Sequence, residues 1–176
     1  AQESRGLGDV YKRQAYGNVQ VVADSTAFGG FSASFDGTGD YIESASKGAE
    51  VTPGLEEDWT VCGWVTPASA STSRVLVATR KTTTPQAGWN IYHNTDASVG
   101  IEFFDISTTY YSLQSGSGKV SNGVRAYVAL TKKGRLYRIF VNGVLVASQT
   151  FNAAIYNSTG LSLRCLLYTS PSPRDS

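Results

Sequence analysis

The stretch that decides the fold is GVRAYVALTKKGRLYRIFVNGVLVASQTF, residues Gly123–Phe151. It contains three runs rich in Val, Ile, Leu, Tyr and Phe, the residue types that favour β-strands. These runs are Arg125–Thr131, Leu136–Val141 and Val144–Thr150. The Asn142-Gly143 pair favours a type I′ turn, because both of its positions can adopt positive φ. The stretch therefore predicts a three-stranded antiparallel meander, with its first joint at the polar segment Lys132-Lys133-Gly134.

The rest of the chain repeats this pattern of short β-rich runs between turn signals, which is typical of an all-β sandwich or barrel. The expected strands are Tyr16–Ala23, Phe31–Phe35, Tyr41–Glu43, Trp59–Val65, Arg74–Arg80, Trp89–Asn94, Val99–Phe104 and Thr109–Leu113, with another beginning at Leu161. Alternation within Trp59–Val65 places Trp59 on one face and Cys62 and Trp64 on the other. We interpret this run as a central strand, so we expect Trp59 and Trp64 in the core and Cys62 as a small buried hydrophobe.

Three ordered segments carry a resemblance to a known family. Residues 35–42, FDGTGDYI, and residues 58–65, DWTVCGWV, are similar to the opening and to one strand of laminin-G-like, concanavalin A-like jelly-roll modules. Residues 129–148, ALTKKGRLYRIFVNGVLVAS, resemble the signature of the same modules. The resemblance covers about residues 28–164 and implies an all-β, antiparallel two-sheet β-sandwich, a concanavalin A-like jelly roll. Family members continue into one more strand, so the resemblance also implies that the domain is truncated before its final strand.

The two ends of the chain are related through DNA. A DNA sequence that encodes Ser4–Gln14 also encodes, on its complementary strand, the peptide CLLYTSPSPR, which is the sequence of residues 165–174. That DNA resembles a transposase-type sequencing-library adaptor. We therefore predict adaptor-derived, non-native tails at residues 1–14 and 165–176 around a concanavalin A-like domain at residues 15–164 that is incomplete at its C-terminus. We expect the tails to lack specific packing and the parent protein to have further domains.

The charge balance argues against two classes of partner. The chain has 15 basic and 14 acidic residues, and removing the predicted tails leaves 11 of each. A neutral domain has no net attraction to nucleic acid or to an anionic membrane surface. No segment approaches the roughly 20 apolar residues that span a bilayer, so we expect no membrane insertion.

Catalytic and metal-binding patterns are sparse. Retaining glycoside hydrolysis needs two carboxylates about 5 Å apart, but Glu102 and Asp105 are three residues apart and so point to opposite faces of a strand. His93 is the single His and has no nucleophile motif nearby, so we assign no catalytic residue and expect a non-enzyme. Asp36 and Asp40 flank a Gly-rich turn, and the resemblance implies a possible calcium site there. The alternative, that both are turn residues, stays open.

Aromatic residues gather in the run from residue 89 to residue 113. Aromatic faces beside Asn, Asp and Gln suit sugar rings, so we predict ligand-binding residues Trp89, Tyr92, His93, Tyr110 and Tyr111. The expected function is a non-catalytic carbohydrate-binding or adhesion module of a larger secreted, cell-surface or viral tail protein, with a glycan or surface protein as partner. A structural protein–protein interaction module in a virion or surface assembly is one alternative, and a fragment of a glycoside hydrolase is another.

Overall fold

The protein is described by a computed structural model that covers residues 13–36, 39–47, 51–69, 71–79, 85–157 and 160–168. These residues form β-strands joined by turns and one short 3-10 helix, η1 (Phe28–Gly30). The strands are β1 (Arg13–Tyr16), β2 (Gln20–Ala23), β3 (Phe31–Ser34), β4 (Tyr41–Lys47), β5 (Trp59–Val65), β6 (Arg74–Ala78), β7 (Trp89–His93), β8 (Val99–Phe104), β9 (Tyr110–Gln114), β10 (Ala126–Lys133), β11 (Leu136–Val141), β12 (Val144–Thr150) and β13 (Ser162–Tyr168).

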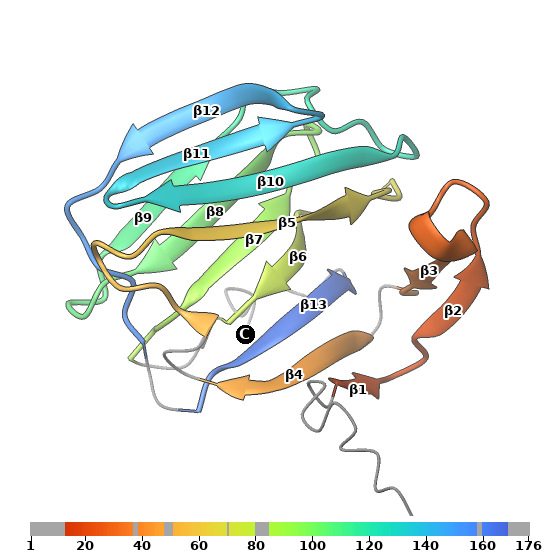
Figure 1. Ribbon diagram of the computed structural model, residues 1–176, viewed down its shortest axis with the longest axis horizontal. Helices are drawn as coiled ribbons and strands as arrows, with labels where there is room; N and C mark the ends of the chain where they lie inside the picture. Colours follow the sequence, from red (N-terminus) through yellow and green to blue (C-terminus); the bar gives the residue numbers. More distant parts are fainter. Residues whose placement is uncertain are drawn as a thin grey trace, which may run out of the picture.

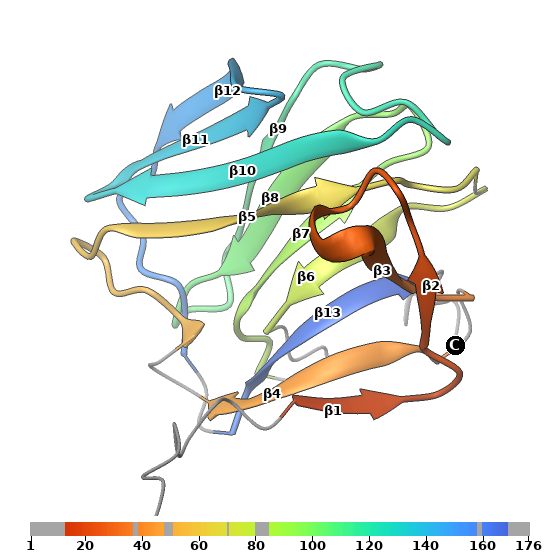
Figure 2. The same ribbon diagram turned by 45° about the vertical axis from the view of Figure 1, so that its right-hand side comes forward.

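Two antiparallel sheets pack face to face, as the sequence predicts (Figure 1). The larger sheet has seven strands in the order β1-β4-β13-β6-β7-β8-β9, and the smaller has four in the order β12-β11-β10-β5. The hairpin of β2 and β3 forms a separate two-stranded sheet beside the end of β5 (Figures 1 and 2). The fold is thus an all-β, two-sheet sandwich.

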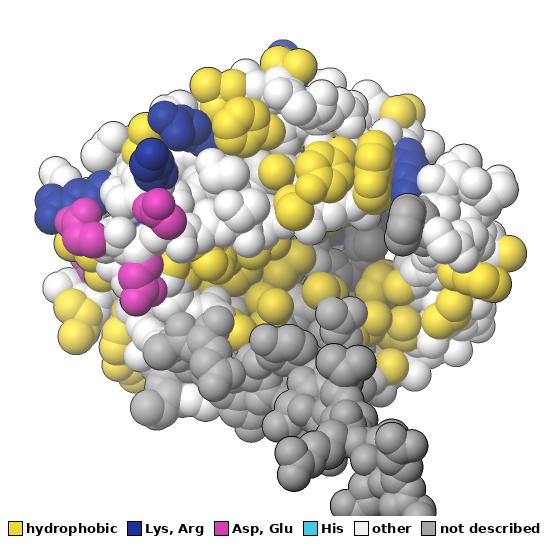
Figure 3. All heavy atoms as spheres, in the orientation of Figure 1, with side chains coloured by type: hydrophobic (Ala, Val, Ile, Leu, Met, Phe, Trp, Pro, Cys, Tyr) yellow, Lys and Arg dark blue, Asp and Glu magenta, His cyan; other side chains and the backbone are white. Residues whose placement is uncertain are grey.

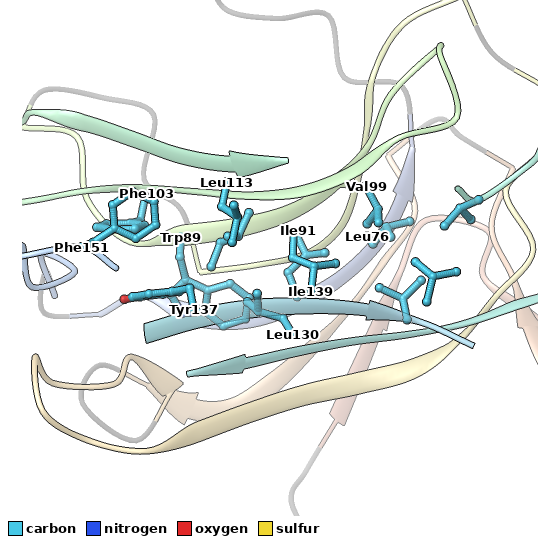
Figure 4. Packing of buried hydrophobic residues seen from close by; sticks show 14 of the residues in the cluster. Leu76, Trp89, Ile91, Val99, Phe103, Leu113, Leu130, Tyr137, Ile139 and Phe151 are labelled. Carbon is cyan, nitrogen blue, oxygen red and sulfur yellow. The ribbon is translucent and has the colours of Figure 1, made fainter. Parts of the chain in front are cut away.

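The core lies between the two sheets and is built by strand alternation. Along β10, buried and partly exposed residues alternate, so that Ala126, Val128 and Leu130 point inward. They meet an apolar layer from the seven-stranded sheet, shown in Figure 4, that contains Leu76, Trp89, Ile91, Val99, Ile101, Phe103 and Leu113. Each fully buried large side chain in this layer stabilises the fold by about 1.5–3 kcal/mol.

The predicted meander is confirmed, with a shift at its first joint. The three strands β10, β11 and β12 pair in sequence, and Val141 is opposite Val144 across the second turn. Both turn residues have positive φ, 50° at Asn142 and 81° at Gly143, as a type I′ turn requires. The first joint is shorter than expected, because Lys133 pairs with Leu136 and so Lys132 belongs to the strand.

Lys132 links the smaller sheet to the loop before β5. The residue is only 2% exposed, and its Nζ donates to the carbonyl oxygens of Gly54 at 2.7 Å, Leu55 at 2.8 Å and Glu57 at 2.7 Å. Burial lowers the pKa of this ammonium because it loses water, and the nearby carboxylate of Glu56 opposes that shift. One cation therefore satisfies three carbonyl groups of an otherwise irregular segment.

Strand β5 departs from the expected position. Its alternation is confirmed, but within the described residues it lies at the edge of the four-stranded sheet and pairs with β10 alone. The prediction of a central strand is therefore wrong. The prediction that Cys62 and Trp64, the outward residues, are buried is wrong as well. Trp59 packs inward with its ring edge-on to Trp89 at 4.6 Å, whereas Trp64 is 58% exposed and Cys62 is exposed.

The expectation that both tails lack packing is wrong for the described residues nearest the domain. Strand β13 runs to Tyr168 and lies between β4 and β6, with Leu166 opposite Tyr41 and Tyr168 opposite Val75. Residues 13 and 14 likewise pair with β4 as part of β1. An apolar run such as Cys-Leu-Leu-Tyr suits a strand between two others whatever its origin. The predicted boundaries at residues 14 and 165 remain predictions.

Replacing Gly143 tests the second turn. Gly143→Val is expected to lower the free energy of unfolding by about 1–3 kcal/mol, because a β-branched residue resists positive φ. The measurement is a thermal or urea melt. Gly116→Val is the matched control, since Gly116 does not adopt a left-handed φ and a Cβ there meets nothing closer than Lys119 Cε at 3.7 Å. Equal melting of the two variants would contradict the type I′ turn.

Candidate functional site

Trp89, the first predicted ligand-binding residue, is a core residue. It is 0% exposed, its indole Nε1 donates to the carbonyl oxygen of Val51 at 2.9 Å, and its ring meets Trp59 edge-on. The indole therefore has no face available for a sugar. Its contacts instead connect the two sheets and the loop around Val51.

Tyr92 and His93 are also buried. The Tyr92 ring lies across Gly100, where an added Cβ would be 2.5 Å from the Tyr92 hydroxyl, and burial raises the pKa of that hydroxyl. The ring Nε2 of His93 lies 2.7 Å from the carbonyl oxygen of Val120, which fastens β7 to the loop before β10. Neither side chain belongs to an exposed aromatic platform.

Tyr110 and Tyr111 lie near the edge of the seven-stranded sheet. Tyr110 is 49% exposed, and its hydroxyl donates to Glu102 Oε2 at 2.7 Å. Tyr111 stacks on Phe103 at 5.1 Å, its hydroxyl donates to Asp105 Oδ2 at 3.1 Å, and burial is the main cause of its raised pKa. Of the five predicted residues, Tyr110 alone presents an exposed ring, so the structure does not assemble them into one surface.

Asp36 and Asp40, the residues of the predicted calcium site, are joined by a hydrogen bond. The Asp40 side chain is fully buried, Oδ1 accepts from the backbone N–H of Asn18 at 2.5 Å, and Oδ2 accepts from that of Asp36 at 2.8 Å. No group of three or more His, Cys, Asp or Glu side chains that could hold a metal occurs in the described part of the chain. Both oxygens of Asp40 thus accept backbone N–H groups, and the calcium site at these residues remains a prediction.

An aromatic group that sequence reasoning missed lies on the outward face of the four-stranded sheet. Trp64 of β5 is opposite Tyr127 of β10, and their rings are 5.2 Å apart with an interplanar angle of 58°. The guanidinium carbon of Arg125 lies 4.9 Å from the centre of the Trp64 ring. We call these three residues the aromatic face. Hydrophobic side chains also cross this side of the molecule in Figure 3, and the exposed Leu145, opposite Phe140, belongs to the same outward side.

The aromatic face is held by polar contacts at both ends. Arg125 Nη1 donates to Thr26 Oγ1 at 2.5 Å and lies 3.3 Å from Asp24 Oδ2, which attaches the β2–β3 hairpin to β10. Hydrogen bonds from Thr26 are the main cause of the lowered pKa of Asp24, with Arg125 contributing, so Asp24 is ionised at neutral pH. At the other end, the backbone N–H of Tyr127 donates to Asn142 Oδ1 at 2.8 Å.

These contacts prepare the aromatic face to bind a flat, partly apolar ligand. Two aromatic rings on a paired stretch of sheet have fixed backbones, so little ordering entropy is lost when a ligand stacks on them. The guanidinium adds planar hydrogen-bond donors beside the rings. The alternation of β5 predicts that Trp64 and Cys62 share a face. What the sequence does not show is that this face is uncovered.

An apolar cleft of about 210 Å³ lies at the free edge of β5. Its lining comes from Phe35, from β5 and β10 of the smaller sheet, and from β6, β7 and β13 of the seven-stranded sheet. The lining residues are Phe35, Val61, Cys62, Gly63, Trp64, Val65, Leu76, Val77, Ile91, Val128 and Cys165. Apart from the thiols of Cys62 and Cys165, the side chains among these lining residues are apolar.

Residues 36–167 match the family model described as the concanavalin A-like lectin/glucanases superfamily. The chain belongs to this superfamily. Solved structures with the same fold include the botulinum neurotoxin serotype D binding domain, with a TM-score of 0.68 and 14% identity over 91% of this chain and 40% of that one. The receptor-binding domain of a C/D mosaic botulinum neurotoxin matches with a TM-score of 0.67 and 15% identity over 91% of this chain and 39% of that one.

A third similar structure is described as "Cell entry of botulinum neurotoxin type C is dependent upon interaction with two ganglioside molecules". It has a TM-score of 0.66 and 13% identity, over 93% of this chain and 39% of that one. This member of the lectin/glucanase superfamily thus spans about 40% of the length of these toxin structures, and the likeness shows the fold. No curated protein matches the chain. Among the described residues, no helix is long and apolar enough to cross a bilayer.

Proposed function

We propose that this domain is a non-catalytic carbohydrate-binding module that takes a glycan on the aromatic face. The observation that carries the proposal is Trp64, which is 58% exposed on a sheet face and has Tyr127 and Arg125 against its ring. A large exposed aromatic patch on a soluble domain is a common mark of a binding site. A pyranose ring fits such a patch because its C–H face is apolar while its rim of hydroxyls needs hydrogen-bond partners.

The contacts of two carboxylates of this chain support binding over hydrolysis. The Glu102 side chain is held by Asn90 Nδ2 at 2.8 Å and by the Tyr110 hydroxyl. Asp105 Oδ1 accepts from two backbone N–H groups of its own turn, those of Ser107 at 2.9 Å and Thr109 at 2.8 Å. Both carboxylates thus have structural partners, which is unlike a pair of acids that both face one substrate.

The ganglioside named for the type C toxin is a glycan-bearing ligand of that protein, and it supports the same class of ligand for this chain. On this proposal the domain is part of a larger secreted, cell-surface or virion protein, where surface glycans are available. A protein–protein interaction module is the second candidate, favoured by the exposed apolar side chains of Val144 and Leu145 on the same sheet.

A glycan array probed with three forms of the protein tests the proposal. Trp64→Ala is expected to weaken binding about tenfold or more, because the ring supplies the stacking surface, while Tyr110→Ala should bind as the unmodified protein does. The Trp64 and Tyr110 rings have comparable exposure but lie on different sheets, so each variant serves as the control for the other. Melting curves check that both variants fold.

The outcomes separate the alternatives. Loss of binding in Tyr110→Ala alone would move the site to the outer side of the seven-stranded sheet, near Glu102. Absence of binding to every glycan by the unmodified protein would reject the carbohydrate proposal and leave the interaction module.

A further inference from the structure

We infer that the aromatic face selects glycans that carry a carboxylate, with Arg125 as the group that binds it. This inference rests on the proposed function and names the class of sugar that the site takes. It starts from the position of a cation directly beside the exposed ring on which the sugar would stack.

The hydrogen bonds of Arg125, whose side chain is 22% exposed, use one side of its guanidinium. Arginine has five N–H donors, and the two contacts to the β2–β3 hairpin, with Thr26 and Asp24, both use Nη1. The Nε–H and the two N–H groups of Nη2 have no hydrogen-bond partner among the described residues. Nε and Nη2 together form a planar fork that matches the two oxygens of a carboxylate, which is the geometry of a bidentate pair.

The surroundings of Arg125 make it the dominant charge of the aromatic face. Within β5 (Trp59–Val65) and β10 (Ala126–Lys133), the acidic or basic residues are Lys132, which is buried, and Lys133, both at the end of β10 far from Tyr127. The nearest opposite charge is Asp24, which holds the guanidinium from the hairpin side. Asp24 therefore positions Arg125 and at the same time reduces its attraction for a second anion.

The Trp64 ring adds to this selection. A guanidinium over an indole face is held by cation–π attraction, which fixes the fork beside the place where a sugar ring would stack. A sugar stacked on Trp64 with a carboxylate at its rim would give the guanidinium an ionic partner, whereas a neutral sugar would offer it hydroxyl oxygens only. The site is thus expected to discriminate by charge at one position of the ligand.

The test compares lactose with 3′-sialyllactose by calorimetry, using the whole chain. The unmodified protein is expected to bind the acidic sugar about tenfold more tightly, and Arg125→Gln should bring the ratio of the two affinities close to one. Asp24→Asn keeps the shape and the acceptor oxygen but removes the competing charge, so it should strengthen binding of sialyllactose without affecting lactose. Arrayed glycans with glucuronate and with sulfate separate carboxylate recognition from attraction to any anion.

Two results would overturn the inference, and they differ from failure of the proposed function. Equal affinity for the two sugars, or an acid preference that survives in Arg125→Gln, would show that Arg125 does not bind the carboxylate of the ligand. Arg125→Lys keeps the charge without the fork, and full retention of the preference in it would reject the bidentate geometry. If no glycan of either kind binds, the proposed function itself fails. Melting curves of each variant confirm that loss of the β2–β3 hairpin contact has not unfolded the domain.

Discussion

Lys132→Met is expected to lower the free energy of unfolding by about 2–4 kcal/mol. Methionine keeps most of the length of the stem but leaves three carbonyl oxygens, those of Gly54, Leu55 and Glu57, without their donor. Hydrogen bonds to a charged group contribute about 1.5–3 kcal/mol each, and water can replace part of this because the loop is partly exposed. The removal of a desolvated ammonium, whose pKa burial lowers, offsets another part.

Urea denaturation of Lys132→Met beside Lys133→Met measures this effect. Lys133 is adjacent in sequence but exposed, so its replacement is expected to change stability by less than about 0.5 kcal/mol. Hydrogen exchange should also show faster exchange in residues 54–58 of Lys132→Met. Equal urea midpoints for the two variants would mean that the loop is held by its other contacts, such as that of Asp58 Oδ1 with the Gly134 N–H at 2.8 Å.

The second large effect is expected at Trp89. Trp89→Ala should cost about 3–5 kcal/mol, because it removes a fully buried ring and leaves a cavity between the sheets. It also leaves the Val51 carbonyl without the indole donor. Trp64→Ala, by contrast, removes a mostly exposed ring and should change stability by less than about 1 kcal/mol.

This pair of tryptophan variants gives opposite expectations for stability and for binding. Trp89→Ala should unfold at a lower denaturant concentration than the unmodified protein. Trp64→Ala should unfold at nearly the same concentration as the unmodified protein but lose glycan binding. Chemical denaturation followed by far-UV circular dichroism measures the first property without depending on either indole. If Trp64→Ala proved as destabilising as Trp89→Ala, the outward face of β5 would have to be covered in solution, and the aromatic face could not be a binding site.

Much of the fold could be predicted from the sequence because it depends on local signals. Asn142-Gly143 between two apolar runs determines a hairpin by its φ requirements alone, and the structure has positive φ at both positions. Alternation likewise predicts which residues of β5 share a face. It does not tell which face is covered, because that depends on the order of strands that are far apart in sequence.

The errors at the candidate site follow from this limit. Trp89 and Trp64 are both tryptophans in apolar strands, yet one is buried between two sheets and the other lies outside. The distinction arises because Trp89 points into the space between the sheets, whereas Trp64 lies on the face of β5 opposite to that of Trp59 and points away from the core. Local composition places Lys132 in a polar joint for a similar reason, since the partners of its ammonium lie some 75 to 78 residues upstream. Local composition does not indicate contacts between residues so far apart in the sequence.

Among the described strands, β5 has a free edge, and this edge has a consequence for how the chain folds. A lysine, a proline or a bulge commonly prevents an edge strand from pairing with another chain. Strand β5 has neither lysine nor proline along its seven residues. Pairing with β10 is intramolecular and its rate does not depend on protein concentration, whereas capture of β5 by another unfolded chain becomes faster as the solution becomes more concentrated. The yield of folded monomer is therefore set by a kinetic competition, and dilution during refolding favours the native outcome of that competition.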